Sequence, residues 1–245
     1  MGNIPPIKGF IETSFLDWPG KVCSVLFLPY CNFRCPFCHN HVLVNAAESL
    51  ESIPLDTVLD RIRSMREWID GVCISGGEPT IHPELLEMIN VIRAEGFKIK
   101  LDTNGTQPET LRYLIMGKFV DEIAMDVKGP LDDISYSACA GVSVPVDLIR
   151  KSINLLLEDR VPYTFRTTVV PSLLPEDKIY EMAKQLRRAT GLILQNFNPA
   201  DPMDSTLKTV APYSEEKLTE IQEGVDKIIK SAKSMVTESA ATGLH

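Results

Sequence analysis

The feature that most constrains the fold is a regular alternation of short apolar runs with segments of helical periodicity. The apolar runs that predict strands lie at 22–28, 71–75, 97–101, 122–127, 163–170 and 192–197. Between them, apolar residues recur at spacings of three and four, which is typical of amphipathic helices. Six strand–helix units with short connections predict a parallel sheet covered by helices. Because a closed eight-unit barrel takes about 250 residues, we expect an α/β fold, a partial (βα)6 TIM-like barrel.

The 245 residues are expected to form a single domain, because no internal boundary, repeat or low-complexity block interrupts the pattern. Its core is predicted at about 18–212, followed by a C-terminal helix at 214–236 and a loose tail at 237–245. A loop is expected between the fourth strand and the next helix. Cys139 lies in that loop, with no partner that the sequence identifies.

Charge and hydropathy exclude two classes of partner. The chain has 25 basic and 33 acidic residues, a net charge of −8, which disfavours binding to phosphate backbones. Its longest apolar stretch is too short to cross a bilayer, and the N-terminus lacks the apolar run of a signal peptide. We therefore expect a cytoplasmic protein without nucleic-acid or membrane partners. In that reducing compartment, clustered cysteines are more often metal ligands or catalysts than disulfides.

Three of the six cysteines lie within eight residues, in the segment "CNFRCPFC". The spacing of Cys31, Cys35 and Cys38 lets one loop present all three sulfurs to a compact metal centre. A zinc site would need a fourth ligand such as His39, His41 or a remote cysteine. A [4Fe–4S] cluster on three thiolates instead keeps one iron open, and that iron can chelate an amino-carboxylate. The iron–sulfur interpretation is favoured once the other polar clusters are counted.

Those clusters follow consecutive predicted strands. The cysteines follow the first strand, "SGGEPT" at 75–80 follows the second, "DTNG" at 102–105 the third, and "DVK" at 126–128 ends the fourth. Each has an ordinary structural interpretation, since glycine pairs and "DTNG" form turns and a lone lysine is usually solvated. In a parallel barrel, however, the loops after the strands share one face. The four clusters are therefore expected to build one site.

The spacing C-x-x-x-C-x-x-C, together with "GGEP", resembles the two signatures of the radical S-adenosylmethionine (SAM) superfamily. The segment "DWPGKVCSVLFLPYCNFRCPFCHN", with the later "DTNG" and "DVK", resembles the activating enzymes of glycyl-radical proteins. Among these, it is similar to the activating proteins of anaerobic ribonucleoside-triphosphate reductase and pyruvate formate-lyase. Trp18 stands where these relatives often have glycine, which indicates a divergent branch.

The resemblance implies a single radical SAM domain and a role for each matched residue. Cys31, Cys35 and Cys38 would be the catalytic cluster ligands, with His39 and His41 outside the metal set. SAM would be bound by Phe37, Gly76, Gly77, Glu78, Pro79, Asp102, Thr103, Asn104, Asp126, Lys128 and Arg166. The implied roles are adenine stacking for Phe37, approach to the methionine ammonium at Gly76, Gly77 and Glu78, a cation and ribose region at Asp102, Thr103 and Asp126, and carboxylate binding by Lys128 and Arg166.

The activity that the resemblance implies is that of an oxidoreductase. The [4Fe–4S] cluster would cleave SAM reductively to a 5′-deoxyadenosyl radical, which would generate a glycyl radical on a partner enzyme, first of all anaerobic ribonucleoside-triphosphate reductase. A flavodoxin- or ferredoxin-type protein would supply the electron, and the oxygen sensitivity of such a cluster predicts an anaerobic setting.

Two alternatives stay open. A radical SAM enzyme acting on a small molecule, of the 7-carboxy-7-deazaguanine synthase type, shares the partial barrel and "GGEP", but "CHN" after the cysteines argues against it. A noncatalytic iron–sulfur or zinc module belongs to a different class of protein. It leaves the polar clusters after the second to fourth strands without a role.

Overall fold

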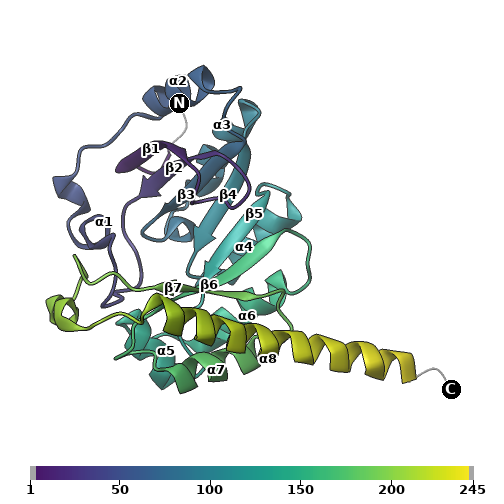
Figure 1. Ribbon diagram of the computed structural model, residues 1–245. Helices are drawn as coiled ribbons and strands as arrows, with labels where there is room; N and C mark the ends of the chain where they lie inside the picture. Colours follow the sequence, from purple (N-terminus) through teal and green to yellow (C-terminus); the bar gives the residue numbers. More distant parts are fainter. Residues whose placement is uncertain (1–3, 243–245) are drawn as a thin grey trace.

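The computed structural model describes the backbone of residues 4–242 and the side chains of residues 4–231. Seven strands form one sheet in chain order (Figure 1). They are β1 (Gly9–Ser14), β2 (Cys23–Leu28), β3 (Gly71–Gly76), β4 (Lys98–Thr103), β5 (Glu122–Asp126), β6 (Tyr163–Val169) and β7 (Leu192–Asn196). β1 is antiparallel to β2, and the strands from β2 to β7 are all parallel. The sheet has β1 and β7 at its edges, so the barrel is open.

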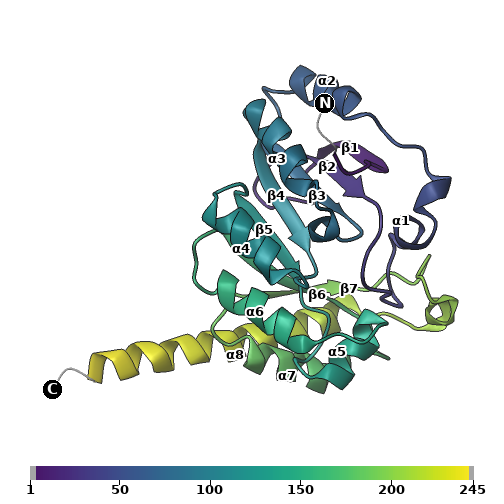
Figure 2. The ribbon, with the colours of Figure 1, turned by 180° about the vertical axis from the view of Figure 1, so that it is seen from behind.

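Helices follow the parallel strands, which confirms the predicted partial barrel. They are α1 (His41–Asn45), α2 (Leu55–Ser64), α3 (Leu85–Ala94), α4 (Pro108–Met116), α5 (Asp133–Ala140), α6 (Val146–Leu156), α7 (Glu176–Gln185) and α8 (Glu215–Thr242). Short 3₁₀ turns are η1 (Ala47–Ser49), η2 (Pro79–Ile81) and η3 (Ser205–Thr209). Figure 2 shows α3, α4 and α6 covering the outer face of the sheet. Within the described part of the chain, no helix has the length and apolar character to span a membrane.

Three elements differ from the predictions. β1 was not predicted, because this edge strand is half exposed and its polar Glu12 and Thr13 interrupt any apolar run. α5 replaces part of the predicted loop and contains Cys139. Its signals are capping residues rather than periodicity: Asp132 accepts a hydrogen bond from the Ser135 N–H (2.8 Å), and Gly141 ends the helix in a left-handed conformation.

The C-terminal helix also differs from its predicted extent. α8 continues to Thr242, so residues 237–242 of the predicted tail are helical. Helix-favouring residues such as Glu238, Ala240 and Ala241 account for the extension. The last part of that predicted tail, 243–245, lies outside the described residues.

α8 covers the outer edge of β7. The side chain of Gln222 accepts a hydrogen bond from the Leu194 N–H and donates one to the Leu192 carbonyl, each at 2.9 Å. One glutamine thus satisfies two backbone groups that an edge strand would otherwise leave unpaired. The C-terminal helix therefore completes the sheet at the point where the barrel stays open.

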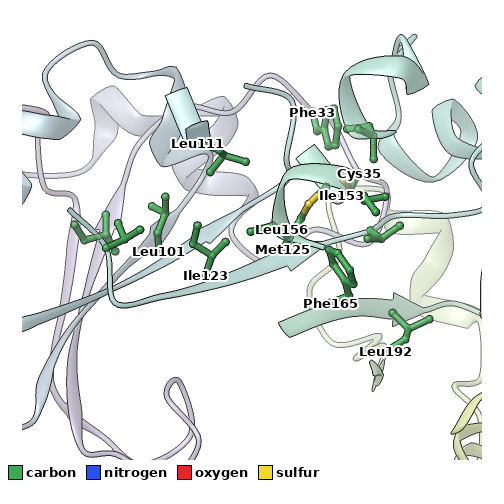
Figure 3. Close-up of a cluster of buried hydrophobic side chains, with 14 of the residues drawn as sticks. Phe33, Cys35, Leu101, Leu111, Ile123, Met125, Ile153, Leu156, Phe165 and Leu192 are labelled. Carbon is green, nitrogen blue, oxygen red and sulfur yellow. The ribbon is translucent and has the colours of Figure 1, made fainter. Parts of the chain in front are cut away.

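The main core lies between the sheet and the helices, and the cysteine loop is anchored in it. Figure 3 shows Phe33 and Cys35 together with core side chains that include Met125, Leu156 and Phe165. The Cys35 side chain is buried, with a residue exposure of 7%. The loop that carries the cysteines is thus packed on the core rather than free on the surface.

A second, smaller core closes the barrel at the amino ends of the strands. Trp18 is fully buried there with Cys23, Val25 and Cys73, and its indole N–H donates to the Glu122 carboxylate (2.6 Å). The departure from the relatives at Trp18 is therefore a packing feature at the end of the barrel opposite the cysteine loop.

Candidate active site

A cavity of about 200 Å³ opens at the carboxyl ends of the parallel strands. Its lining includes the predicted site residues Cys31, Cys35, Phe37, Cys38, Gly76, Gly77, Glu78, Asp102, Thr103, Asn104, Asp126, Lys128 and Arg166. Pro79 is the exception among the predicted residues. It is buried as the first residue of η2 and does not line the cavity. Residues of the loops after β2, β3, β4 and β5, together with Arg166 and Thr168 of β6 itself, thus converge on one space, as the parallel topology predicts.

The loop after β2 folds its sulfurs toward this cavity through local hydrogen bonds. The Cys38 N–H donates to the Cys35 carbonyl (3.0 Å), and the Phe33 N–H donates to the Cys31 sulfur (3.3 Å). The side-chain amide of Asn104, from the loop after β4, lies 3.8 Å from the same sulfur. Cys31 therefore has two N–H donors, which can stabilise a thiolate.

Two distant segments hold the cysteine loop from outside. The Arg34 N–H donates to the Ala140 carbonyl at the end of α5 (2.9 Å). The Asp204 N–H, just before η3, donates to the Pro36 carbonyl (2.8 Å). Both supporting residues lie far along the chain from the cysteines, and no sequence motif pointed to either.

The three thiols are neutral in this environment. Burial raises the pKa of Cys31 to about 12 and that of Cys35 to about 11, and it also raises the pKa of Cys38. Deprotonation therefore needs a strong positive charge, which bound iron supplies. Across the described part of the chain, no three His, Cys, Asp or Glu side chains are placed to share a single metal ion. A cluster differs from an ion in this respect, because each thiolate binds a different iron.

The glycine pair at the end of β3 packs against the end of β2 and the start of the cysteine loop. A Cβ on Gly77 would lie 1.7 Å from the Tyr30 carbonyl oxygen, and one on Gly76 would lie 2.3 Å from that of Leu28. The Gly77 N–H donates to the Leu28 carbonyl (2.9 Å), and the Glu78 N–H donates to the Tyr30 carbonyl (2.8 Å). The glycines are thus required for contact between two loops of the protein, a reason that the sequence did not reveal.

Glu78 joins the loop after β3 to the loop after β4. Its buried carboxylate accepts hydrogen bonds from the Asn104 N–H (2.6 Å), the Thr103 hydroxyl (2.8 Å) and the Thr80 N–H (3.0 Å), and also from the Thr80 hydroxyl. Burial raises the pKa of Glu78 despite these donors. Glu78 therefore has a structural role, that of linking these two loops, in addition to its expected role of offsetting a ligand charge.

Two carboxylates of the cavity wall, Asp102 and Asp126, are paired with cations. Arg166 faces Asp126 across β6 and β5, and its guanidinium bonds to both Asp126 (2.7 Å) and Asp102 (2.9 Å). The Lys128 ammonium lies 3.5 Å from Asp126 and 5.8 Å from the centre of the Phe37 ring. Burial alone would raise the pKa of Asp126, but Arg166 and Lys128 outweigh it and lower that pKa to about 2.

The third cation, Lys100, was not predicted as a site residue. Its buried ammonium donates to the carboxylate of Asp102. Residues two apart in a strand share a face. The order of Lys100 and Asp102 in "KIKLDT" could therefore have predicted that the two side chains lie side by side. Ser75 adds a hydroxyl that donates to Asp102 (3.1 Å) and also lines the cavity.

The histidines beside the cysteines differ in position. His39 lines the cavity, whereas His41 does not and has its Nε2 atom 3.0 Å from the Asp201 carboxylate. Between them, the Asn40 side chain donates to the Gly76 carbonyl (3.2 Å) and ties the end of the cysteine loop to β3.

Comparison with known proteins agrees with this geometry. The model of the radical SAM superfamily matches residues 25–186. A protein of Methanocaldococcus jannaschii, provisionally named a glycyl-radical enzyme activating enzyme, is 32% identical over 226 residues, which cover 91% of this chain and 92% of that protein. The pyruvate formate-lyase-activating enzyme of Clostridium pasteurianum is 28% identical over 146 residues, 58% of each chain.

Solved structures share the fold. Streptococcus suis SuiB bound to S-adenosylmethionine superposes with a TM-score of 0.62 over 84% of this chain at 18% identity. The match covers 49% of SuiB, so this chain spans about half of that protein. TYW1 with a bound lysine–pyruvate adduct superposes with a TM-score of 0.54 over the same share of this chain, at 17% identity.

Proposed function

The chain belongs to the radical SAM superfamily and, within it, to the glycyl-radical enzyme activating enzymes, and from this premise we propose that it activates anaerobic ribonucleoside-triphosphate reductase. Enzymes of this superfamily use a [4Fe–4S] cluster and SAM. The observation that carries the proposal is the convergence of three free thiols and three motif loops on one cavity. The resemblance of "DWPGKVCSVLFLPYCNFRCPFCHN" to the reductase activating proteins supports the choice of partner.

The donor set fits the cofactors. Cys31, Cys35 and Cys38 are soft thiol ligands that would hold three irons, and the same cavity provides cations and hydrogen-bonding groups for an amino-carboxylate beside them. When bound, the cluster and SAM supply a one-electron reduction that releases a 5′-deoxyadenosyl radical able to remove the glycine hydrogen. The chain itself supplies ligands, orientation and a supporting framework.

The other residues of the cavity lining would bind SAM. Lys128 and Arg166 would hold its carboxylate, because both are fixed cations at the cavity surface. Phe37 would stack near the adenine, and Asp102 with Thr103 would face the ribose. Glu78 would act mainly by fixing the end of β4 and the loop after it, since its oxygens already accept hydrogen bonds from Thr103 and Asn104.

The setting that we propose is an anaerobic cytoplasm, with a flavodoxin- or ferredoxin-type protein as electron donor. The six cysteines are all free, which suits a reducing compartment. An open barrel suits a protein substrate, because a loop of another enzyme must reach the cavity. The replacement at Trp18 does not argue against the reductase, since this side chain is fully buried at the other end of the barrel.

The cofactor part of the proposal is tested by a cysteine pair. After anaerobic reconstitution, wild type is expected to bind roughly four irons per chain and to cleave SAM when reduced. Cys35→Ala is expected to lose SAM cleavage at least a hundredfold, because one cluster ligand is missing. Cys23→Ala, a buried cysteine in the small core, is the matched control and should keep both properties. SAM cleavage by Cys35→Ala at the wild-type rate would refute the proposal.

The partner is tested separately. Reduced wild type with SAM is incubated anaerobically with anaerobic ribonucleoside-triphosphate reductase or with pyruvate formate-lyase, and the glycyl radical is measured by paramagnetic resonance. A radical signal on the reductase, and a much weaker one on the lyase, is expected. SAM cleavage without a radical on either protein would instead point to the small-molecule alternative.

A further inference from the structure

Lys100 is a buried ammonium for which the proposed function gives no role. It lies in the middle of β4, and its side chain is only 2% exposed. It does not line the cavity, but its ammonium donates to the cavity residue Asp102 and lies 3.7 Å from the Cys73 sulfur, its neighbour across β3. Lys100 therefore sits one layer below the cavity, in contact with its wall.

Asp102 is held from three directions. One carboxylate oxygen accepts from Lys100, and the other accepts from the Arg166 guanidinium (2.9 Å) and the Ser75 hydroxyl (3.1 Å). These partners come from β4, β6 and β3, so the orientation of the carboxylate is fixed by three strands. Lys100 alone among them approaches it from inside the barrel, because it is the one that does not line the cavity.

Stability alone is a weak reason for this lysine. A buried ion pair generally stabilises a fold no better than apolar residues of the same size, because both charges lose their hydration. The ammonium is nevertheless retained in its charged form. Burial would lower the pKa of Lys100, but the attraction of Asp102 outweighs burial and raises it. The position of the Lys100 ammonium directly behind the Asp102 carboxylate is more simply explained by a role of Asp102 in the cavity.

We propose that Lys100 is a positioning residue, whose fixed ammonium holds the Asp102 carboxylate in one orientation so that it can accept hydrogen bonds from bound SAM. The inference rests on the proposed function and assigns a task to a residue that no motif includes. Because Lys100 does not line the cavity, it would not touch the cofactor. Its effect on the ligand passes through Asp102.

The first test compares two lysines of the same strand. In cluster-loaded protein, Lys100→Met is expected to weaken SAM binding about tenfold, measured by the change that SAM causes in the paramagnetic resonance spectrum of the reduced cluster. Lys98→Met makes the same change at an exposed position of β4 and should bind as wild type does. Binding by Lys100→Met within twofold of wild type overturns the inference. Failure of wild type to bind SAM would instead count against the proposed function.

A double-mutant cycle separates positioning from a general structural role. Asp102→Asn combined with Lys100→Met removes both charges and leaves no unpaired buried ion. If Lys100 acts through Asp102, adding Lys100→Met to Asp102→Asn should change the dissociation constant of SAM by less than twofold. A further tenfold loss in that background would show that Lys100 acts independently, and would overturn the inference.

Chemical rescue covers the case in which Lys100→Met does not fold. Lys100→Ala removes a three-carbon ammonium, which n-propylammonium can replace. The midpoint of thermal unfolding of metal-free Lys100→Ala is expected to be higher in n-propylammonium chloride than in potassium chloride of equal ionic strength. The wild type should show no such difference between the two salts. In cluster-loaded protein, the same salt should restore SAM affinity. Restored stability without restored affinity would limit Lys100 to a structural role and overturn the inference.

Discussion

Glu78 shows how a signature residue can serve the protein as much as its ligand. The motif "GGEP" suggested a carboxylate facing a ligand, and Glu78 does line the cavity. Yet its oxygens accept hydrogen bonds from Thr80, Thr103 and Asn104, so it also joins two loops of the site. A single side chain thus sets the distance between the second and third polar clusters.

Glu78→Gln tests the role of Glu78 in joining the two loops, because it replaces one carboxylate oxygen with an amide nitrogen. The amide would place an N–H₂ group against buried donors, so we expect a loss of ~2–3 kcal/mol in the free energy of unfolding. Chemical denaturation of the metal-free protein measures it. Glu87→Gln on the exposed face of α3 is the control and should change stability by less than ~0.5 kcal/mol. Equal stability of the two variants would contradict the assignment.

At the scale of elements, the cysteine loop depends on two segments that carry no signature. The end of α5 receives the Arg34 N–H, and the segment before η3 donates to Pro36. Gly141 makes the first contact possible, since a Cβ there would lie 1.9 Å from the Arg34 carbonyl oxygen. The region after the fourth strand, which was predicted to be a loop, is therefore a support of the candidate site.

Gly141→Ala should damage this support more than its backbone strain explains. Gly141 and Gly20 both have left-handed φ angles, +69° and +76°, but nothing lies within 4 Å of a Cβ at Gly20. We expect Gly20→Ala to cost ~1 kcal/mol from strain alone, and Gly141→Ala ~2–4 kcal/mol because Arg34 must also move. Only Gly141→Ala should bind less iron on reconstitution. Equal iron content in both variants would show that α5 does not position the loop.

Over the whole molecule, fixed charges join strands that lie far apart in the sequence. Arg166 of β6 contacts carboxylates of β5 and β4, and Lys100 reaches Asp102 from below. These contacts cross three neighbouring strands of the open barrel. Because no strand pairing joins the two edges of the sheet within residues 4–242, such side-chain links contribute to holding the curvature of its middle.

The pH dependence of folding should report these links. Asp126 has a pKa of about 2 in the folded protein against 3.8 ordinarily, so its stabilising contribution is present above pH 3.8 and is lost as the pH falls through 2. In the metal-free wild type, we expect the free energy of unfolding to fall by ~2 kcal/mol between pH 4 and 2 because of Asp126. Asp126→Asn should not show this part of the decrease. Urea unfolding at several pH values measures this, with exposed Glu67→Gln as control. Parallel acid profiles for wild type and Asp126→Asn would refute the expectation.

The sequence by itself determined the architecture and most of the candidate site. Six apolar runs predicted β2 to β7, because buried parallel strands are continuously apolar. The placement of polar clusters after the first four runs then predicted a common site, since parallel strands end on the same face. β1 was not predicted because it is half exposed. α5 was not predicted because its signals are the capping residues Asp132 and Gly141 rather than a periodic pattern.

Only the tertiary structure decided which groups face the cavity and which support it. It placed Pro79 outside the lining, showed that Gly77 is required by Tyr30, and brought Lys100 against Asp102. The physical reason is that these relations depend on distances between strands and loops far apart in the chain. Periodicity and motif spacing describe one segment at a time, whereas burial and ion pairing are set by the segments that pack against it.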